Sequence, residues 1–390
     1  MNEIFLGFIF DGKKSETLIK ENKFGLQIAA NQYQYGFIKG FEKRLQIISV
    51  LPAGTYPKNS KKARYYESVG EVSGGKVQYI PFINVYFVKE YSQKRQLLKE
   101  LKKQILPDEK YVIYVYSLYM PFLKVLKKIK RKISNIYICL IIPDLPGKYG
   151  IMRKITSLGG IRDRLEAQKK IAMAGIADSY IFLTEKMKEV FPKRPYAVIE
   201  GFLPNSNFPQ NVKRQPKTIL YTGSLNTALG VDRLLEAFEK IEDNEYELWI
   251  CGAGGIQPEV EAYTKKDRRI KYMGFLAKSD ISLLQVKCDV LVNPRSNNDE
   301  FTKYSFPSKT MEYLLSGSKV VMYPLSGIPQ EYFEFITVVE GDSVEDLKNT
   351  LIAACEDMEF YNKRSQQQIQ WISREKTNVK QVEKLKNIFK

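Results

Sequence analysis

The stretch YSFPSKTMEY, residues 304–313, joins two different hydrophobic patterns. The apolar run DVLVNPR (289–295) precedes it, and an amphipathic run that closes at Gly317 follows it. A short apolar run bounded by turn residues predicts a buried strand, whereas apolar residues three and four apart predict a helix. Pro307 suits the first turn of that helix, because its φ is already helical and it has no N–H to leave unsatisfied. The stretch therefore predicts a strand–turn–helix unit.

Four polar side chains crowd this predicted helix start. Ser305 and Ser308 can cap backbone N–H groups, and Lys309 follows them directly. With the positive end of the helix dipole, these groups form an anion site of the kind that binds phosphate. Glu312 lies one turn further in, where its carboxylate can accept hydrogen bonds from ribose hydroxyls. The alternative is an ordinary capped helix on which Lys309 and Glu312 form a surface pair.

Strand and helix patterns alternate through the whole chain. In the first half the strand patterns are 4–10, 45–52, 77–83, 111–118 and 136–144, and the helix patterns include 21–41 and 91–105. The alternation restarts at KTILYTGSL (217–225), after a turn-rich segment that ends near residue 210. Such alternation predicts an α/β fold with mostly parallel sheets, in two domains that meet near residue 205. Ligands of such sheets bind beyond the carboxyl ends of the strands.

Histidine is absent and the four cysteines are far apart. The absence of histidine excludes Ser-His-Asp and Cys-His nucleophile schemes and most zinc sites. Cys139, Cys251 and Cys288 lie in or beside apolar runs, so we expect reduced, packed thiols in a cytoplasmic protein, with no metal site. No apolar run approaches the roughly 18 residues of a membrane-spanning helix. The opening MNEIFLGFIF lacks the marks of a signal peptide and predicts a strand.

The net charge of +17 is confined to the first half, with +18 in residues 1–205 and −1 in residues 206–390. Such asymmetry predicts that one domain meets a polyanion or an anionic membrane. The segment FLKVLKKIKRKIS (122–134) fits either a solvated helix that covers a sheet or a membrane-surface patch. The basic residues of YPKNSKKARYY (56–66) would extend that patch. Nucleic-acid binding is the alternative, although no known motif supports it.

The segment that begins NPR…FTKYSFPSKTMEYLLSGSK and ends at Tyr332 resembles the donor-binding segment of retaining glycosyltransferases of the GT-B fold (family 4-like, group 1). The similarity is to bacterial enzymes of capsular and exopolysaccharide synthesis. It covers most of residues 215–375, because YTGSL, GVDRLLEAF, LWICGAGG and RIKYMGFL follow in the family's order. In the first half it rests on NKFGLQIAANQYQYGFIKG, IIPDLPG and LTEKM…YAVIEG.

The resemblance implies two Rossmann-like, doubly wound domains that face each other across a cleft. Residues 1–205 would bind the acceptor, and residues 206–371 would bind a nucleotide-sugar donor. The helical segment 372–390 would pack back onto the first domain.

The resemblance also implies roles for individual residues. Arg295 and Lys309 would neutralise the diphosphate leaving group, and with Asp144 they are the catalytic candidates. Phosphate, base and ribose contacts would come from Gly223, Ser224, Gly274, Phe275, Lys303, Tyr304, Ser305, Ser308 and Glu312.

Some family positions differ in this chain. Ser224 and Leu229 occupy places where many relatives carry Arg and Lys, and Tyr304 occupies the place of the first glutamate of a pair. Nearby charged residues are the expected replacements for the missing cations and carboxylate: Arg295, Lys303, Lys309 and Glu300. A catalytically silent partner subunit is the alternative.

The first half adds candidates for contact with the sugar or the acceptor. Asp144 follows a buried strand and precedes a Pro-Gly loop, which is a usual position for a functional side chain. Gly25 could let backbone approach the sugar, and Glu200 is a further candidate. The alternatives are an ordinary turn glycine and a plain Asp turn before proline.

The resemblance implies a retaining, metal-independent transfer of a hexose to a glycan acceptor. The resemblance implies a UDP-sugar as donor and no cofactor. A lipid-linked glycan would be the acceptor, at an anionic membrane that the basic first domain contacts. Such a protein would act in surface polysaccharide synthesis, in the cytoplasm or peripherally on the inner face of the plasma membrane.

Overall fold

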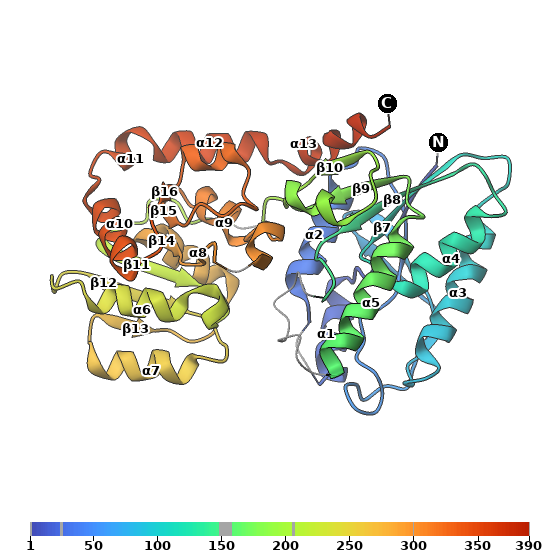
Figure 1. The fold of residues 1–390 in the computed structure, drawn as a ribbon, viewed down its shortest axis with the longest axis horizontal. Helices are drawn as coiled ribbons and strands as arrows, with labels where there is room; N and C mark the ends of the chain where they lie inside the picture. The colour runs from blue at the N-terminus through green and yellow to red at the C-terminus, as the bar shows by residue number, and fades with distance from the viewer. Residues whose placement is uncertain (1, 24–25, 148–157, 205–206, 299, 390) are drawn as a thin grey trace. The chain divides into compact units, whose positions relative to one another are not determined.

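The computed structural model describes residues 2–23, 26–147, 158–204, 207–298 and 300–389. The chain divides into two compact units, Met1–Phe202 with Asn378–Lys390 (unit 1) and Leu203–Thr377 (unit 2) (Figure 1). Helix α12 (Ser365–Glu375) lies within unit 2. The chain therefore returns to unit 1 at residue 378, six residues later than the sequence analysis expected.

Unit 2 is built on one six-stranded parallel sheet with the order β13-β12-β11-β14-β15-β16. Its strands are β11 (Gln215–Thr222), β12 (Glu247–Cys251), β13 (Ile270–Tyr272), β14 (Cys288–Asn293), β15 (Lys319–Met322) and β16 (Thr337–Val338). This is the 3-2-1-4-5-6 order of a doubly wound fold, which reverses direction between β11 and β14. The carboxyl ends of those two strands are therefore the expected ligand position.

Helices connect the strands of unit 2 and bury their apolar sides in one core. They are α6 (Val231–Glu239), α7 (Gln257–Lys266), α8 (Lys278–Lys287), α9 (Lys309–Leu315), α10 (Val344–Glu356) and α11 (Phe360–Lys363), with α12 after them. In α6 the buried residues recur at helical spacing, as in Leu234, Leu235 and Phe238. α10 begins at a capping box formed by Ser343 and Asp346.

Unit 1 holds an eight-stranded sheet with the order β10-β9-β8-β7-β1-β2-β5-β4. Its strands are β1 (Asn2–Gly7), β2 (Gln46–Ser49), β4 (Ser68–Val72), β5 (Gly75–Tyr79), β7 (Tyr111–Tyr116), β8 (Ile136–Ile142), β9 (Ser179–Phe182) and β10 (Tyr196–Val198). Only the edge strand β4 pairs antiparallel within this sheet. β3 (Arg64–Tyr65) and β6 (Phe82–Ile83) form a separate antiparallel pair.

The C-terminal segment packs against the helices and strands of unit 1. The main helices of the unit are α1 (Gly12–Glu21), α2 (Ile28–Lys39), α3 (Lys89–Gln104), α4 (Met120–Lys130) and α5 (Leu158–Ala174). Helix α13 (Asn378–Glu383) contacts α2, and the short 3-10 helix after it contacts β10. Gly40 allows this approach, because a Cβ at that position would overlap the carbonyl oxygen of Asn378. The C-terminal segment is thus an integral part of unit 1.

The predicted α/β class with parallel sheets is confirmed in both units. The predicted helix 21–41 begins only at Ile28, and the predicted strand 77–83 is divided into β5 and β6. The β4–β5 hairpin was missed because its strands are short and polar on one side. All four cysteines are free and buried, as expected.

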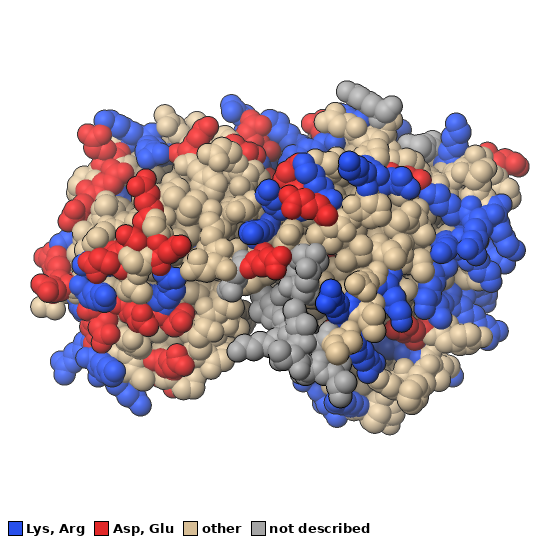
Figure 2. Space-filling view, viewed as in Figure 1, with Lys and Arg blue, Asp and Glu red and all other residues tan. Residues whose placement is uncertain are grey.

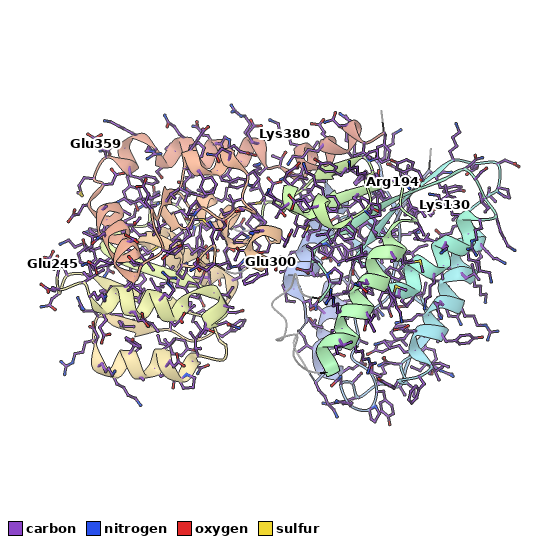
Figure 3. The ribbon with its side chains drawn as sticks, viewed as in Figure 1. Lys130, Arg194, Glu245, Glu300, Glu359 and Lys380 are labelled. Atoms are coloured by element: carbon purple, nitrogen blue, oxygen red, sulfur yellow. The ribbon has the colours of Figure 1, made fainter. Side chains whose placement is uncertain are left out.

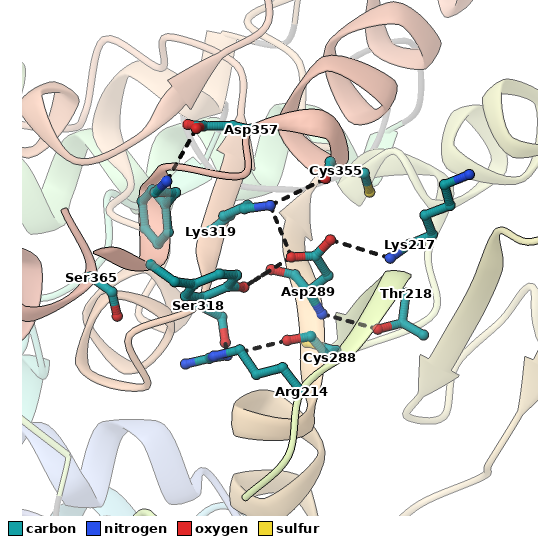
Figure 4. Close-up of polar contacts among 12 residues, drawn as sticks. Arg214, Lys217, Thr218, Cys288, Asp289, Ser318, Lys319, Cys355, Asp357 and Ser365 are labelled. Atoms are coloured by element: carbon teal, nitrogen blue, oxygen red, sulfur yellow. Dashed lines mark hydrogen bonds and ion pairs between the residues drawn. The ribbon is translucent and has the colours of Figure 1, made fainter. Parts of the chain in front are cut away.

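A buried ion pair joins two central strands of unit 2 (Figure 4). The Nζ of Lys319 on β15 lies 3.0 Å from Oδ1 of Asp289 on β14, and these side chains are only 4% and 6% exposed. The backbone N–H of Lys217 donates to Oδ2 of Asp289 at 3.2 Å, and the hydroxyl of Tyr361 donates to Oδ1 at 3.0 Å. The hydrogen bonds and the ion pair of Asp289 thus link β11, β14, β15 and α11.

We expect Asp289→Asn to lower the free energy of unfolding by about 3–5 kcal/mol, because it leaves Lys319 charged, buried and without a counter-ion. The double variant Asp289→Asn/Lys319→Met removes both charges and should recover much of that loss. Urea denaturation measures both effects. Asp243→Asn is the control, since it breaks an exposed ion pair with Lys217 and should change little. Wild-type stability in Asp289→Asn would contradict this account.

Candidate functional site

Three backbone turns meet at the carboxyl edge of the unit 2 sheet. The N–H of Gly223, just after β11, donates to the carbonyl of Cys251 at 3.0 Å, and the N–H of Gly252 donates to the carbonyl of Gly274 at 2.8 Å. Gly252 has φ +143°, and a Cβ there would overlap the carbonyl oxygen of Gly223. A Cβ at Gly254 would likewise overlap the carbonyl oxygen of Leu225. Only glycine permits this packing, which the sequence GAGG supplies.

The turns carry three of the predicted donor contacts, Ser224, Gly274 and Phe275. Ser224 is exposed, and its carbonyl accepts a hydrogen bond of 2.8 Å from the hydroxyl of Tyr221. Gly274 has φ +68° and open space where a Cβ would stand. Phe275 beside it is 86% exposed. A flat aromatic ring in water next to a backbone loop can stack on a nucleotide base.

The end of β11 is held by a tyrosine that the sequence analysis missed. Tyr313 on α9 is buried, and its hydroxyl accepts from the N–H of Thr222 at 3.1 Å and lies 3.0 Å from the hydroxyl of the same residue. Burial raises the pKa of Tyr313, so its hydroxyl stays protonated. The hydroxyl of a buried Tyr needs a hydrogen-bond partner. A tyrosine among the apolar residues of a predicted helix was therefore the feature of the sequence that could have identified Tyr313. Tyr313 therefore sets the position of α9 against the β11 turn.

Lys309 and Glu312 are brought together on the first turn of α9. The Nζ of Lys309 lies 3.0 Å from Oε2 of Glu312, whose side chain is nearly buried. Gln285 of α8 donates to Oε1 of Glu312 at 3.2 Å. Sequence analysis missed Gln285, which is a polar residue on the buried side of α8. The carboxylate is thus fixed in position and retains lone pairs for a hydroxyl-bearing ligand.

The charge of Lys309 also reaches the end of β12. Burial raises the pKa of the Cys251 thiol to about 11, and the Lys309 ammonium opposes that rise. The Lys309 ammonium is therefore within electrostatic range of the thiol of Cys251, the residue before Gly252. This places a cation beside the packed glycine turns, where a phosphate would meet both.

Arg295 follows β14, so it lies at the carboxyl edge of the unit 2 sheet. Its Nη1 donates to the hydroxyl of Ser305 at 3.1 Å, and its guanidinium lies 5.6 Å from the ring centre of Phe301. Its Nε is buried and has no hydrogen-bond partner within the part of the chain that the structure describes. Burial lowers the pKa of Arg295 and raises that of Tyr221, and the nearby guanidinium moderates the rise at Tyr221. A half-buried guanidinium with an N–H that no described residue pairs is suited to bind an anion.

The remaining residues of the opening stretch have simpler surroundings. Ser308 is the N-cap residue of α9, and its side chain makes no capping hydrogen bond. Lys303 is exposed and Tyr304 half-buried in a 3-10 helix, Glu300–Tyr304, whose first residue is also exposed (Figure 3). Because α9 has only seven residues, its dipole is small, and the groups available at its start are side chains and turns.

Unit 1 carries the other predicted residues. Asp144 follows β8 with its side chain exposed, and desolvation raises the pKa of its carboxyl. Its charge contributes, after burial, to the raised pKa of Tyr116 at the end of β7. Gly25 lies outside the described residues. Glu200 is buried, and its Oε2 lies 3.0 Å from the Nζ of Lys384, so it holds the C-terminal segment to unit 1.

Among the residues that the structure describes, no group of three or more His, Cys, Asp or Glu side chains is placed to hold a metal ion. No helix of the described residues is long and apolar enough to cross a membrane.

Solved structures resemble the chain over its whole length. A sucrose-phosphate synthase from Thermosynechococcus elongatus has a TM-score of 0.64 and 14% identity, with 100% of this chain and 99% of that chain covered. Anabaena HepE in complex with UDP and glucose has a TM-score of 0.65 and 14% identity, with 100% and 99% covered. A mutant of S. aureus TarM, in complex with fondaparinux, alpha-GlcNAc-glycerol and UDP, has a TM-score of 0.62 and 12% identity, with 100% of both chains covered. The chain has the GT-B fold that these proteins share.

Sequence comparison decides the family of the second unit. Residues 216–357 match the family profile described as glycosyl transferases group 1. These residues form a glycosyltransferase group 1 domain. The sequence-based assignment to the glycosyltransferases is thereby confirmed, and the domain contains β11 to β16 with the packed glycine turns and the α9 residues. A comparison with curated protein sequences finds no match.

We expect Gly252→Ala to destabilise this glycosyltransferase domain by several kcal/mol, because it adds a Cβ that overlaps the carbonyl oxygen of Gly223 at a backbone conformation that only glycine adopts readily. Gly255→Ala is the matched control, since nothing lies within 4 Å of a Cβ there. Chemical denaturation measures both. Equal stabilities of the two variants would show that the turns can separate at little cost.

Proposed function

We propose that the protein transfers a hexose from a UDP-sugar to a glycan acceptor, with retention of the anomeric configuration and without a metal ion. The observation that carries this proposal is the half-buried Arg295 guanidinium, whose Nε has no hydrogen-bond partner among the described residues, at the carboxyl edge where β11 and β14 diverge. Lys309 lies beside the turns of the same edge, and Glu312 is fixed next to it. Two cations and a carboxylate there match the diphosphate and the ribose of one nucleotide.

The chemistry follows from where charge develops. When the bond between the anomeric carbon and the phosphate oxygen breaks, negative charge accumulates on the departing diphosphate. Arg295 and Lys309 are fixed before the reaction, so they stabilise that charge without reorganisation. In a front-side attack the acceptor oxygen bonds to the anomeric carbon, and its proton passes to the departing phosphate. This route retains configuration and needs no protein nucleophile.

The acceptor side of the proposal rests on unit 1 and on the relatives. We assign Asp144 to contact with the acceptor or with sugar hydroxyls, because it follows a central strand and its pKa is raised. Structures of HepE and TarM, which share this fold, hold UDP together with glucose or with a GlcNAc derivative. A lipid-linked glycan in surface polysaccharide assembly, on the inner face of the plasma membrane, fits the strong positive charge of residues 1–205.

A catalytically silent partner subunit is the second candidate. Ser224, Leu229 and Tyr304 replace two basic residues and a glutamate of the family pattern. Lys303 and Glu300 stand close in the chain as replacements, and both are exposed. Donor turnover separates the two candidates, since a silent subunit would bind the nucleotide without releasing the sugar.

Glu312→Ala and Lys309→Ala should each weaken UDP binding about 10- to 100-fold, because each removes a charged hydrogen-bonding group worth about 1.5–3 kcal/mol. Isothermal titration calorimetry measures the affinity, and circular dichroism checks that the fold is intact. Glu261→Ala and Lys265→Ala are controls on α7 and should bind like wild type. Wild-type affinity in either α9 variant would remove the site assignment.

A panel of nucleoside diphosphates tested with and without EDTA extends this measurement. We expect UDP to stabilise the protein against heating more than the other nucleotides do, and EDTA to have no effect. Loss of the shift with EDTA would overturn metal independence. A shift with another base would overturn the choice of UDP.

Asp144→Asn should lower the transfer rate and remove the acid limb of the pH profile. Desolvation raises the pKa of the Asp144 carboxyl, so its ionised form is lost at a higher pH than an ordinary Asp, whose pKa is about 3.9. A raised pKa in the folded state also means that ionisation costs stability, which falls as pH rises through the interval between the unfolded and folded values. At pH 7 the Asn variant should therefore unfold no more easily than wild type. An unchanged pH–rate profile would exclude Asp144 from the reaction.

A further inference from the structure

We propose that unit 1 docks on an anionic lipid bilayer through one exposed aromatic surface, whose side chains enter the headgroup region. This aromatic surface consists of Tyr56, Val85, Tyr86, Phe87, Val88 and Tyr91. The inference rests on the proposed function in one respect, namely that the acceptor is lipid-linked. It identifies the residues that would bring the protein to such an acceptor.

The exposure of these side chains is the first observation. Phe87 is 90% exposed and Tyr86 is 68% exposed, and their rings pack edge to face at 4.8 Å. Large apolar side chains exposed singly are common, but a contiguous group of them marks an interaction site. The aromatic surface lies at the start of α3, directly after β6.

The fold holds two segments of the chain together at this surface. Arg64 of β3 pairs with Ile83 of β6, and Tyr56 forms an isolated bridge with Val85. Asn84 is fully buried, and its side chain donates to backbone carbonyls of both Gly54 and Lys62. The segments 52–66 and 82–91 therefore form one fixed base under the aromatic side chains. A preorganised surface loses less entropy on binding than a flexible loop does.

Basic residues are frequent in the two segments that carry the aromatic surface. Residues 56–66 contain four basic residues and no acidic one, and residues 84–95 contain three basic residues and one acidic residue. The exposed basic side chains among them are Lys58, Lys61, Arg64 and Arg95. Figure 2 shows Lys and Arg gathered over the part of unit 1 that carries α3 and α4. An anionic bilayer complements this surface, because each Lys or Arg near the membrane adds favourable attraction.

Helix α4 cannot supply the apolar part of a membrane contact. Phe122, Leu123 and Leu126 of its apolar side are buried in the core of unit 1. Lys130 of its basic side already pairs with Asp178 at 2.6 Å (Figure 3). The sequence pattern of 122–134 thus belongs to a helix that covers the sheet, and α4 contributes only positive charge. Insertion into the headgroup region needs apolar side chains, which the aromatic surface provides.

The chemistry of the surface favours lipid over glycan. The side chains of Val85, Phe87 and Val88 have no hydroxyl or N–H group, so these side chains offer no hydrogen bonds to a sugar. Tyr56, Tyr86 and Tyr91 combine an apolar ring with a polar tip, which suits the membrane–water interface.

Co-sedimentation with vesicles tests the proposal on the full-length protein. We expect binding to phosphatidylglycerol–phosphatidylcholine vesicles that falls with salt, and about tenfold weaker binding to phosphatidylcholine alone. Tyr86→Ser/Phe87→Ser should lower binding to the anionic vesicles about tenfold or more, because less apolar surface leaves water. Lys61→Glu/Arg64→Glu should lower it similarly and weaken its salt dependence.

Matched variants in unit 2 control for general effects. Met358→Ser removes an equally prominent exposed apolar side chain, and Lys265→Glu/Lys266→Glu makes the same change in net charge on α7. Both should bind vesicles like wild type. Phe87→Trp supplies a direct probe, whose fluorescence should shift to the blue with anionic vesicles and be quenched by brominated lipid.

Three results would overturn the proposal. One is wild-type vesicle binding by Tyr86→Ser/Phe87→Ser. Another is a change in oligomeric state of that variant in analytical ultracentrifugation, which would assign the surface to a second copy of the chain. The third is binding to a soluble anionic polysaccharide that competes with the vesicles, which would assign it to a glycan.

Donor binding by the same variants separates this inference from the proposed function. Tyr86→Ser/Phe87→Ser should bind UDP like wild type. In the protein without substitutions, normal UDP binding and turnover without any vesicle binding would overturn the docking surface alone. Normal vesicle binding without UDP binding would overturn the proposed function alone.

Discussion

Backbone contact between glycine turns is the constraint on which the candidate site depends. Gly252 lies so close to the carbonyl oxygen of Gly223 that no side chain fits, and Gly254 meets Leu225 in the same way. The strands β11 and β12 can therefore deliver their turns to one place, beside the turn of Gly274. A bulkier residue would separate the turns and widen the edge at which a phosphate could be held. The chemistry proposed for this edge presupposes that packing.

Behind the turns, buried polar groups set the positions of the functional side chains. Tyr313 ties α9 to the end of β11, and Gln285 fixes Glu312 from α8. The Asp289–Lys319 pair joins β14 to β15 near the amino ends of these strands, at the edge of the sheet opposite the site. Each of these contacts joins elements that are distant in sequence, and each would cost stability if one partner were lost. The site is thus held by the same interactions that hold unit 2 together.

Much of this architecture could be predicted from local pattern. Apolar runs of strand length, followed by helical spacing, predicted both sheets, and the glycines and proline of the turns predicted where the chain leaves each strand. Lys309 and Glu312 could be paired from their spacing alone. Tyr313 and Gln285 could not be assigned, because their partners lie on other elements. The amphipathic pattern of 122–134 could not tell a helix that covers a sheet from one that covers a membrane, since both need one apolar side.

By itself, the sequence determined the alternation of strand and helix, the buried state of the four cysteines, the absence of histidine chemistry and the concentration of positive charge in the first half. These properties depend on local spacing and composition, which need no partner from elsewhere in the chain. Tertiary structure decided that Arg295 keeps a buried N–H which no described residue pairs, that Glu200 holds the C-terminal segment, and that the aromatic surface around Phe87 stays in water. These properties depend on which distant segments meet, and only the folded chain brings those segments together.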